Sequence, residues 1–336
     1  MRKIPEGVIA LAPMAGYSDF AFRTVCRLWG ADLVYSEMTA ARFLLAGGDI
    51  PKDSPVVQLF GSDPQELAEA ARLVESSAMW VNFNAACPVR KVAEKGAGVA
   101  LLGDLRRLRI IVRRMRSVLQ KPLSVKIRLG LEKNVVEKII SLLLEEGVDL
   151  IELHPRTARQ LYSGKVDRKV FAHIKERFPV ALYASGDIFT PHDVRELFEV
   201  YGVDGVLVAR GAVGSPWIFR SSKLYMKEGR VYSPDVDEIL ETIELHLRLL
   251  KLSKGPRAAA IFRKFISGYT RGMRNARKYR LMMMREDSVE GLIKLFREFM
   301  LAHACHAQYR ELYVGGGYED GKEDKSADCE TGARWT

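Results

Sequence analysis

The amino-acid sequence predicts an α/β protein, a (β/α)8 TIM barrel followed by a small C-terminal helical bundle. Over about residues 8–210, short apolar runs alternate with longer segments whose apolar residues recur at helical spacing. The runs are apolar on both faces, which is typical of parallel strands covered by helices. Beyond residue 216 the helical spacing continues without further strand signals. A chain of 336 residues has room for a barrel of about 250 residues and a smaller appendage.

Eight strands are predicted within the barrel region, each four to six residues long. They span residues 8–13, 33–36, 55–60, 80–84, 123–127, 150–154, 181–185 and 205–209. Two of the helices between them have clear starts, because Asp63 precedes Pro64 and Thr190 precedes Pro191. A capping side chain is then followed by proline at the first helical position. Eight such βα units in series favour a closed barrel over an open doubly wound sheet.

The helical bundle is predicted from three segments with apolar residues at helical spacing: residues 235–252, 256–270 and 287–309. The chain is therefore expected to divide into a catalytic barrel over residues 1–222, a helical domain over 223–312 and a tail over 313–336. The tail is polar, Gly-rich and poor in apolar residues, a composition that predicts disorder.

The charge of the chain is concentrated in one segment. The net charge is +10, and residues 251–280 contain ten Lys or Arg and no Asp or Glu. A compact basic segment of this kind predicts a polyanionic partner, most often a nucleic acid.

Cysteine usage and hydropathy exclude several classes of protein. Four cysteines without paired spacing argue against a disulfide framework and for a reducing, cytoplasmic location. The apolar runs are far shorter than the ~20 residues of a membrane-spanning helix, so no membrane association is expected. His303, Cys305 and His306 lack partner ligands at zinc-like spacing, so no metal is expected either. Nothing in the pattern favours a particular oligomeric state.

Polar side chains stand at or near the carboxyl ends of nearly all the predicted strands, where (β/α)8 barrels carry their active sites. They are Glu37, Gln58, Asn84, Cys87, Lys126, Arg128, His154, Ser185, Asp187 and Arg210. Any single member could be an ordinary loop residue, but their recurrence at seven strand ends predicts one shared active-site mouth. The Gly-containing turns over residues 184–187 and 209–214 lie where such barrels commonly bind phosphate.

Eight sequence motifs, which occur in a fixed order along the chain, resemble those of a known family. They are APMAGYSDFAFR (12–23), SEM (36–38), VVQLFG (56–61), NFNAACPVRKV (82–92), VKIRLG (125–130), HPRTARQLYSG (154–164), ASGDI (184–188) and VARGAVGSPWIF (208–219). Together they resemble the tRNA-dihydrouridine synthases, in which a basic helical domain also follows the barrel. The family usually has Asp-Ile-Asn before Gly-Cys-Pro, whereas this chain has Asn82-Phe83-Asn84 and Ala86-Cys87-Pro88. The family's Asn-Gly before Asp is Ser185-Gly186 here.

The resemblance implies FMN as the cofactor, with NADPH or NADH as its reductant. The isoalloxazine ring is expected against the backbone of Pro13, Met14 and Ala15, and its pyrimidine edge beside Gln58 and Lys126. Lys126 would place a cation where it stabilises the anionic reduced flavin. The ribityl chain and phosphate are expected to contact the remaining mouth residues, His154, Ser185, Gly186, Asp187, Ala209 and Arg210.

The same resemblance implies reduction of the C5–C6 double bond of specific uridines in tRNA, with a hydride from the flavin N5 to C6 and a proton to C5. A thiol with a pKa of about 8.5 is protonated at neutral pH yet can release its proton. Cys87, between Asn84 and Pro88 after a strand end, is the predicted donor. Cys26, within a helix pattern, is predicted to be a small buried hydrophobe. Asn84 is expected to orient the uracil or the Cys87 loop, and Arg128 to bind substrate.

A uridine in folded RNA must be flipped out of its stack to reach such a mouth, and flipping requires a grip on the surrounding backbone. The predicted phosphate contacts are Arg271, Arg274, Arg277 and Lys278, within a wider basic set that includes Arg257, Arg263, Lys264 and Arg280. A second stripe of arginines, from Arg106 to Arg116, either extends this footprint or belongs to an ordinary outer barrel helix.

Two other functions are compatible with parts of the pattern. An FMN barrel oxidoreductase acting on a free pyrimidine such as dihydroorotate would share the mouth, but it would leave the basic helical domain without a role. A non-catalytic RNA-binding protein would use the basic domain, but it would leave the polar strand ends unexplained.

Overall fold

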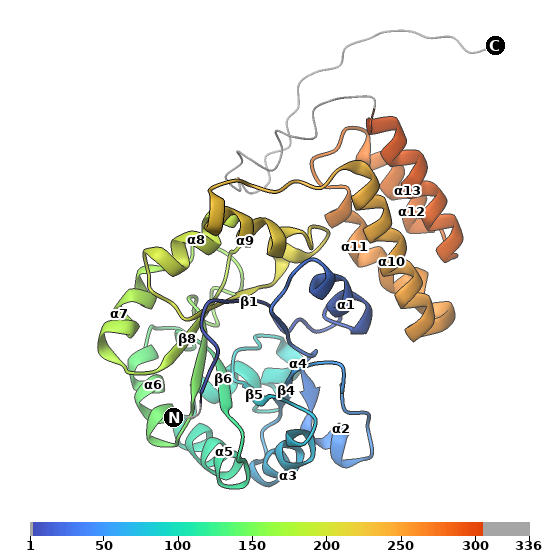
Figure 1. The fold of residues 1–336 in the computed structure, drawn as a ribbon. Coiled ribbons are helices and arrows are strands. Elements are labelled where there is room, and N and C mark those ends of the chain that lie inside the picture. The colour runs from blue at the N-terminus through green and yellow to red at the C-terminus, as the bar shows by residue number, and fades with distance from the viewer. Residues whose placement is uncertain (1–2, 305–336) are drawn as a thin grey trace, which may run out of the picture.

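The computed structural model describes residues 3–304 and consists of a parallel barrel surrounded by helices, with a further helical bundle on one side (Figure 1). All strands belong to one parallel sheet in the order β2-β1-β9-β8-β7-β6-β5-β4-β3. Their bounds are β1 (Val8–Leu11), β2 (Leu33–Val34), β3 (Thr39–Ala40), β4 (Val56–Phe60), β5 (Trp80–Asn84), β6 (Leu123–Arg128), β7 (Leu150–His154), β8 (Ala181–Ser185) and β9 (Gly205–Val208).

The barrel closes through its second strand, which is broken into two short pieces. β2 pairs with β1, and β3 pairs with β4. Between the two pieces, Tyr35 forms a bridge with Val56, and the Ser36 N–H donates to the Val56 carbonyl oxygen at 2.9 Å. The eight predicted strands are therefore all present, with the two-residue β3 as a continuation of the second, and the predicted fold class is confirmed.

Helices cover the outside of the barrel. They are α1 (Phe20–Leu28), α2 (Ala41–Leu45), α3 (Pro64–Glu75), α4 (Arg90–Ala93), α5 (Leu105–Val118), α6 (Val136–Glu145), α7 (Lys169–Arg177), α8 (Pro191–Glu199) and α9 (Ile218–Glu228). The two predicted starts are confirmed: the Asp63 carboxylate caps α3, and Thr190 forms a reciprocal capping box with Asp193 at the start of α8. Residue 222 lies inside α9, which packs against α8, so the helices beyond the barrel begin with α10.

The bundle contains α10 (Val236–Lys254), α11 (Ala258–Tyr269), α12 (Ala276–Arg285) and α13 (Val289–Ala304). Three of these helices match the predicted segments, whereas α12 forms where no helix was predicted. The last residues of the third predicted segment and the predicted tail over 313–336 lie outside the described residues. Within residues 3–304, no helix is long and apolar enough to span a membrane.

The bundle and the barrel share one hydrophobic core. The Trp29 indole N–H donates to Thr242 Oγ1 of α10 at 3.0 Å, and the rings of Phe22 and Phe265 lie 5.0 Å apart. Gly214, in the loop after β9, lies against the backbone of α11, where an added Cβ would come within 2.1 Å of the Gly268 carbonyl carbon. Close packing of this kind fixes the bundle against the end of the barrel.

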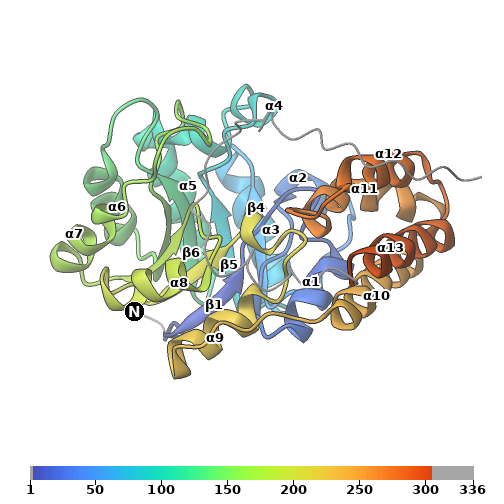
Figure 2. The ribbon, with the colours of Figure 1, turned by 90° about the horizontal axis from the view of Figure 1, so that it is seen from above.

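The bundle reaches the end of the barrel at which the strands finish. In Figure 2, α4, which follows the carboxyl end of β5, lies along the upper edge, and α12 lies on the same side. The α10 and α9 helices lie toward the opposite edge. The loop between α11 and α12 is therefore on the mouth side of the molecule.

Candidate active site

Polar side chains line the mouth half of the barrel interior, at alternate positions along neighbouring strands. Because every second residue of a strand faces the same side, each strand contributes a short polar column. The columns are Asn82 and Asn84 on β5, Ser124, Lys126 and Arg128 on β6, and Glu152 and His154 on β7, and all seven side chains are buried. The other half of the interior is filled by an apolar cluster that includes Val8, Leu33, Val56, Trp80 and Leu150.

Cys87 lies in the loop after β5, and neighbouring groups hold the peptide units of this loop. Asn84 Oδ1 accepts hydrogen bonds from the N–H groups of Ala86 and Cys87, both at 2.9 Å. Arg128 Nε donates to the Ala86 carbonyl oxygen at 3.1 Å, and the Val99 N–H donates to the Cys87 carbonyl oxygen at 3.1 Å. The position of the thiol is thus set by β5, β6 and the segment that follows α4.

Gly98 makes this arrangement possible. Its φ is +59°, and a Cβ at this position would lie 2.6 Å from the Cys87 carbonyl oxygen. The Cys87 side chain is partly buried. Burial raises the pKa of the thiol, and the opposing effects of the Val89 amide and Arg128 are smaller. Cys87 is therefore protonated at neutral pH, as a proton donor must be.

Three amide side chains form a chain of hydrogen bonds beside this loop. Asn84 Nδ2 donates to Gln58 Oε1 at 2.8 Å, Gln58 Nε2 donates to Asn82 Oδ1 at 2.5 Å, and Asn82 Nδ2 donates to Ser124 Oγ at 2.7 Å. A carboxamide has two donor hydrogens, so Gln58 has one N–H left for a further acceptor. The predicted role of Asn84 in orienting the loop matches these contacts, since its oxygen is occupied by the loop N–H groups.

Arg128, which was predicted to bind substrate, is buried and contacts the carbonyl groups of two loops. Its side chain is 1% exposed, and besides Ala86 it donates to the carbonyl oxygens of Thr157 at 3.0 Å and Leu161 at 2.7 Å. It therefore ties the loop after β7 to the Cys87 loop. Tyr162, which is 55% exposed, lies over the guanidinium at 5.4 Å.

Lys126 and His154 are buried and electrostatically perturbed. The Lys126 ammonium makes no hydrogen bond or contact ion pair with the described residues, and burial lowers its pKa to about 8 although Glu152 raises it. Burial and the surrounding cations lower the pKa of His154 to about 2, so its imidazole is neutral. Arg156 Nη1 lies 3.4 Å from His154 Nε2, and because a guanidinium only donates, Nε2 is the acceptor.

The turn after β8 carries an arginine cluster. The Asp187 carboxylate, in a residue with φ +47°, accepts hydrogen bonds from Arg156 at 3.0 and 2.5 Å and from Arg210 at 2.6 Å. Arg156 is 1% exposed, whereas Arg210 is half exposed. Two cations and one anion leave a net positive charge beside Gly186. The side chain of Asp187 thus orients arginines, so a contact from this residue to a phosphate would come from its backbone.

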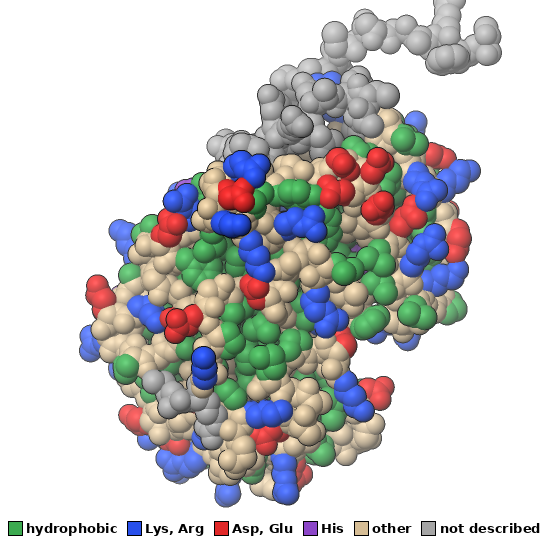
Figure 3. All heavy atoms as spheres, viewed as in Figure 1, with side chains coloured by type: hydrophobic (Ala, Val, Ile, Leu, Met, Phe, Trp, Pro, Cys, Tyr) green, Lys and Arg blue, Asp and Glu red, His purple; other side chains and the backbone are tan. Residues whose placement is uncertain are grey.

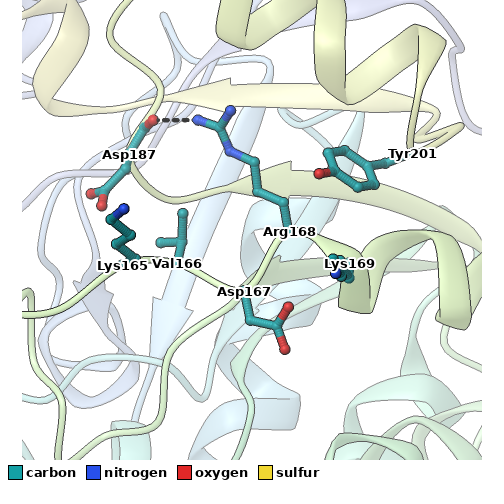
Figure 4. Close-up of a pocket in the computed structure, with 7 residues that line it drawn as sticks. All are labelled: Lys165, Val166, Asp167, Arg168, Lys169, Asp187 and Tyr201. Atoms are coloured by element: carbon teal, nitrogen blue, oxygen red, sulfur yellow. Dashed lines mark hydrogen bonds between the residues drawn. The ribbon is translucent and has the colours of Figure 1, made fainter. Parts of the chain in front are cut away.

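A cavity of about 370 Å³ flanks this turn (Figure 4), lined by residues 165–169, Asp187 and Tyr201. Arg168 crosses it and donates to the Asp187 carbonyl oxygen at 2.8 Å. The same guanidinium pairs with Asp193 and Glu196. Asp187 is the only predicted site residue among its lining residues, so this cavity adjoins the mouth without containing it.

The loop after β1 brings Pro13, Met14 and Ala15 to the same end of the barrel. The Met14 N–H donates to Ser18 Oγ at 2.9 Å, and the Gly16 N–H donates to Glu37 Oε1 at 2.5 Å. Pro13 and Met14 are partly buried and Ala15 is exposed. Ser185 ends β8 and is buried, and Ala209 follows β9. The predicted mouth residues therefore converge on one end of the barrel.

The basic segment divides into two groups. Arg263 pairs with Asp287 at 2.5 Å, Lys264 lies 4.0 Å from Asp19, and Arg280 donates to Thr270 Oγ1 at 2.7 Å. Arg271, Arg274, Arg277 and Lys278 are exposed on the loop before α12 and on its first turn. The four residues predicted to contact phosphates are thus exposed, as are Lys251 and Arg257 of the same segment.

Three of the six arginines in the stripe on α5 pair with acids. Arg113 makes a bidentate contact with Glu146 at 2.7 and 2.8 Å, Arg109 pairs with Glu145 at 2.6 Å, and Arg116 pairs with Asp149 at 3.0 Å. On the face seen in Figure 3, basic and acidic side chains are interspersed over the outer helices. These pairs favour an ordinary outer barrel helix for α5.

A sequence profile described as dihydrouridine synthase matches residues 10–303. The chain belongs to the dihydrouridine synthase family. It is 34% identical over 319 residues to tRNA-dihydrouridine synthase B of Pseudomonas syringae pv. tomato, covering 88% of this chain and 92% of that protein. It is 34% identical over 272 residues to tRNA-dihydrouridine synthase B of Escherichia coli K12, with 77% and 85% covered. A probable tRNA-dihydrouridine synthase of Aquifex aeolicus is 32% identical over 307 residues, with 87% and 96% covered.

Solved structures with a similar fold are more distant in sequence. An old yellow enzyme homologue from Zymomonas mobilis is 13% identical, with a TM-score of 0.46, over 70% of this chain and 94% of that one. A histamine dehydrogenase from Rhizobium is 11% identical, with a TM-score of 0.47, over 72% and 48%.

The cofactor of the dihydrouridine synthase family is FMN, and three features of this mouth fit it. Lys126 brings a buried ammonium without a contact partner among the described residues. Gly186 has φ +100°, and a Cβ there would lie 2.9 Å from the His154 ring, so a bare backbone adjoins the imidazole. The cluster around Asp187 has excess positive charge, which suits a phosphate.

Two mouth residues were missed by the sequence reasoning, Glu152 and Arg156. Glu152 lies two positions before His154 on β7, and Arg156 lies two positions after it in the following loop; both are buried. Attention to strand ends overlooked Glu152, whereas the period of two along the strand would have selected it.

Proposed function

We propose that this protein is a tRNA-dihydrouridine synthase, which reduces the C5–C6 double bond of uridines in tRNA, with Cys87 as the proton donor. The observation that carries the proposal is the Cys87 loop. A protonated thiol is held at the end of β5 by Asn84 and Arg128, next to a buried amide network and a buried lysine. Membership of the family supplies the substrate class, because the relatives matched across most of their length are named for this reaction.

FMN bound at the mouth supplies the hydride that reduces C6, and NADPH or NADH serves as its reductant. The backbone of Pro13, Met14 and Ala15 would line one side of the ring. Gln58 would donate its remaining amide hydrogen to the pyrimidine edge, and the Lys126 ammonium would lie near the same edge and favour negative charge there. The ribityl and phosphate groups would be held by His154, Ser185, the backbone of Gly186 and Asp187, Ala209 and the Arg210 guanidinium.

Cys87 completes the reduction by releasing its proton to C5. The raised pKa keeps the thiol neutral until the base arrives, and the resulting thiolate is stabilised by the Val89 amide and by Arg128, both of which lower the pKa. General acid catalysis of this kind contributes about 10²- to 10⁴-fold to a rate.

Asn84 and Arg128 act through the loop rather than through the uracil ring. Both bind peptide groups at residues 86 and 87. A displacement of the donor by about 1 Å is enough to cost roughly 10²-fold in rate, so these contacts serve the geometry of proton transfer. We assign both as positioning residues.

The exposed cations Arg271, Arg274, Arg277 and Lys278 would bind the tRNA backbone while the target uridine is flipped into the mouth. Their location on the mouth side of the bundle supports this assignment. A substrate of this kind supports a cytoplasmic location.

Purified protein decides between this function and its alternatives. We expect a yellow protein with a flavin spectrum that forms dihydrouridine in unmodified tRNA, measured as a 2 Da mass increase in a single nucleotide. Activity on free uridine or dihydroorotate without activity on tRNA would favour the small-molecule oxidoreductase. A colourless protein that binds RNA without turnover would favour the non-catalytic alternative.

A further inference from the structure

Glu152 is a carboxylate inside the barrel to which the proposed reaction assigns no role. Its side chain is 0% exposed. The Tyr35 hydroxyl donates to Oε1 at 2.8 Å, and Oε2 has no hydrogen-bond partner among the described residues. Burying a carboxylate in this way is costly unless an opposite charge compensates it. The interior of the barrel should therefore contain a cation whose charge compensates that of Glu152.

Lys126 is that cation. Lys126 and Glu152 are register partners on β6 and β7, and both face the interior. Burial raises the pKa of Glu152 to about 7, and Lys126 is the largest of the influences that oppose this rise. In turn, Glu152 is the acid that raises the pKa of Lys126. The two side chains make no direct hydrogen bond, so their attraction acts through the low-dielectric interior, where charges are only weakly screened.

The other groups around Lys126 do not supply a negative charge. Arg128 on β6 lowers the pKa of Lys126. His154 on β7 is neutral because its pKa is lowered to about 2. Tyr35 before β3 and Tyr183 on β8 are neutral, because burial raises the pKa of both hydroxyl groups. The Cys87 thiol after β5 is also neutral, and Asp187 after β8 is bound by Arg156 and Arg210.

The neighbouring strand on the other side of β6 supplies no negative charge. Asn82 faces the interior on β5 as a neutral amide. Asn82 is the register partner of Ser124, two residues before Lys126. Glu152 on β7 is therefore the carboxylate among the polar columns of β5, β6 and β7.

We propose that Glu152 is the positioning residue for Lys126, an interior carboxylate that holds Lys126 as an ammonium ion facing the cofactor site. Its significance for the reaction rests on the proposed function, because that function gives Lys126 its role at the flavin. The electrostatic pairing itself depends only on the residues of this chain.

The test is the titration of Lys126 in the full-length holoenzyme with its flavin oxidised. Protein labelled with ¹³Cε-lysine is followed by NMR against pH, and the Lys126 signal is assigned by its loss in Lys126→Met. In Glu152→Gln, which keeps an oxygen for the Tyr35 hydroxyl, the Lys126 midpoint should fall by about one pH unit or more. The control Glu145→Gln, an exposed carboxylate on α6, should leave it unchanged.

Relocating the charge separates pairing from simple structural support. In the double variant Asn82→Asp/Glu152→Gln, the Lys126 midpoint should return toward the wild-type value, because a carboxylate again adjoins β6. A Lys126 midpoint that is the same in wild type and Glu152→Gln would overturn the proposal, and so would a double variant that behaves like Glu152→Gln alone.

Two further outcomes remain decisive. If Glu152→Gln does not fold, the wild-type titration still tests the pairing, because the Lys126 signal must then respond to two ionisations rather than one, and a single step would refute it. If the midpoint shifts as expected while the wild type makes no dihydrouridine in tRNA, the pairing stands and the proposed function fails.

Discussion

The barrel mouth and the basic loop of the bundle use polar residues in opposite ways. At the mouth, Asn84, Gln58 and Arg128 are buried, and each is held by hydrogen bonds to amide or carbonyl groups. On the bundle, Arg271 and Arg277 are exposed at the surface. Chemistry at a single bond requires fixed geometry, whereas attraction to a polyanion requires charge within reach of many phosphates. Changes in the two regions should therefore alter different measurable quantities.

The largest effect is expected at the mouth. Cys87→Ala should lower the rate of dihydrouridine formation by about 10²- to 10⁴-fold, because it removes the general acid, while flavin content and tRNA affinity stay near wild type. The rate is measured by mass spectrometry of tRNA and the flavin by absorbance. Cys26→Ala, in a buried position on α1, is the control and should keep most of the activity. Loss of flavin from Cys87→Ala would instead indicate a structural thiol.

The joint between the two regions should be the next most sensitive position. Gly214 has φ +76°, and a Cβ there would meet the α11 backbone at 2.1 Å. Gly214→Ala should lower the free energy of unfolding by about 2–4 kcal/mol, from left-handed strain together with overpacking.

Gly229→Ala separates these two contributions to the instability of Gly214→Ala. Gly229 has φ +69° and nothing within 4 Å of an added Cβ, so its replacement should cost only about 1 kcal/mol. Chemical denaturation measures both variants. Equal losses in the two would show that the contact between barrel and bundle is not tight.

Neutralising the basic loop should weaken binding without slowing the chemistry. The triple variant Arg271→Gln/Arg274→Gln/Arg277→Gln should lower tRNA affinity by about 10- to 100-fold at low salt and reduce the slope of log affinity against log salt by roughly 2–3. Flavin reduction by NADPH should be unaffected. The control is Arg106→Gln/Arg114→Gln, at exposed positions on α5. An equal loss of tRNA affinity in this variant would show that the tRNA-binding surface also includes the barrel.

The smallest effect is a difference in pH dependence. Because the pKa of Lys126 is lowered to about 8, its charge is present below that pH and is lost as the pH rises through it. The rate of flavin reduction should fall by about tenfold between pH 7 and pH 9. Binding of tRNA by the arginine loop should stay constant over this range, since guanidinium groups remain charged. If the rate of flavin reduction and the affinity for tRNA fell together, the titrating group would have to act on both the mouth and the basic loop.

Much of the barrel could be predicted from the sequence, because its strands are apolar on both faces and polar residues mark their ends. The short β3 was not predicted, since a strand of two residues has no regular period. The α12 helix was missed because its apolar residues are mostly exposed, as Leu281 and Met284 illustrate. The spacing of apolar residues therefore predicts a helix poorly where that helix packs against few neighbours.

The roles of individual charged residues were harder to predict than their locations. Arg128 and Asp187 lie where expected, yet Arg128 binds carbonyl groups of two loops and Asp187 binds two arginines. Such partners come from segments distant in sequence, so neither spacing nor residue type reveals them. The period of two along β7 could have selected Glu152, but its register partner Lys126 lies on a neighbouring strand that spacing does not reveal.

A single-turnover reaction tests the central claim that the barrel mouth performs the chemistry and the basic loop of the bundle binds the tRNA. Holoenzyme reduced with dithionite is mixed anaerobically with unmodified tRNA, and flavin absorbance and dihydrouridine are followed together. The wild type should be reoxidised with one dihydrouridine formed per flavin, and Cys87→Ala should bind the tRNA yet stay reduced at least about 10²-fold longer. Reoxidation of Cys87→Ala at the wild-type rate, or reoxidation of the wild type by free uridine as fast as by tRNA, would contradict the account.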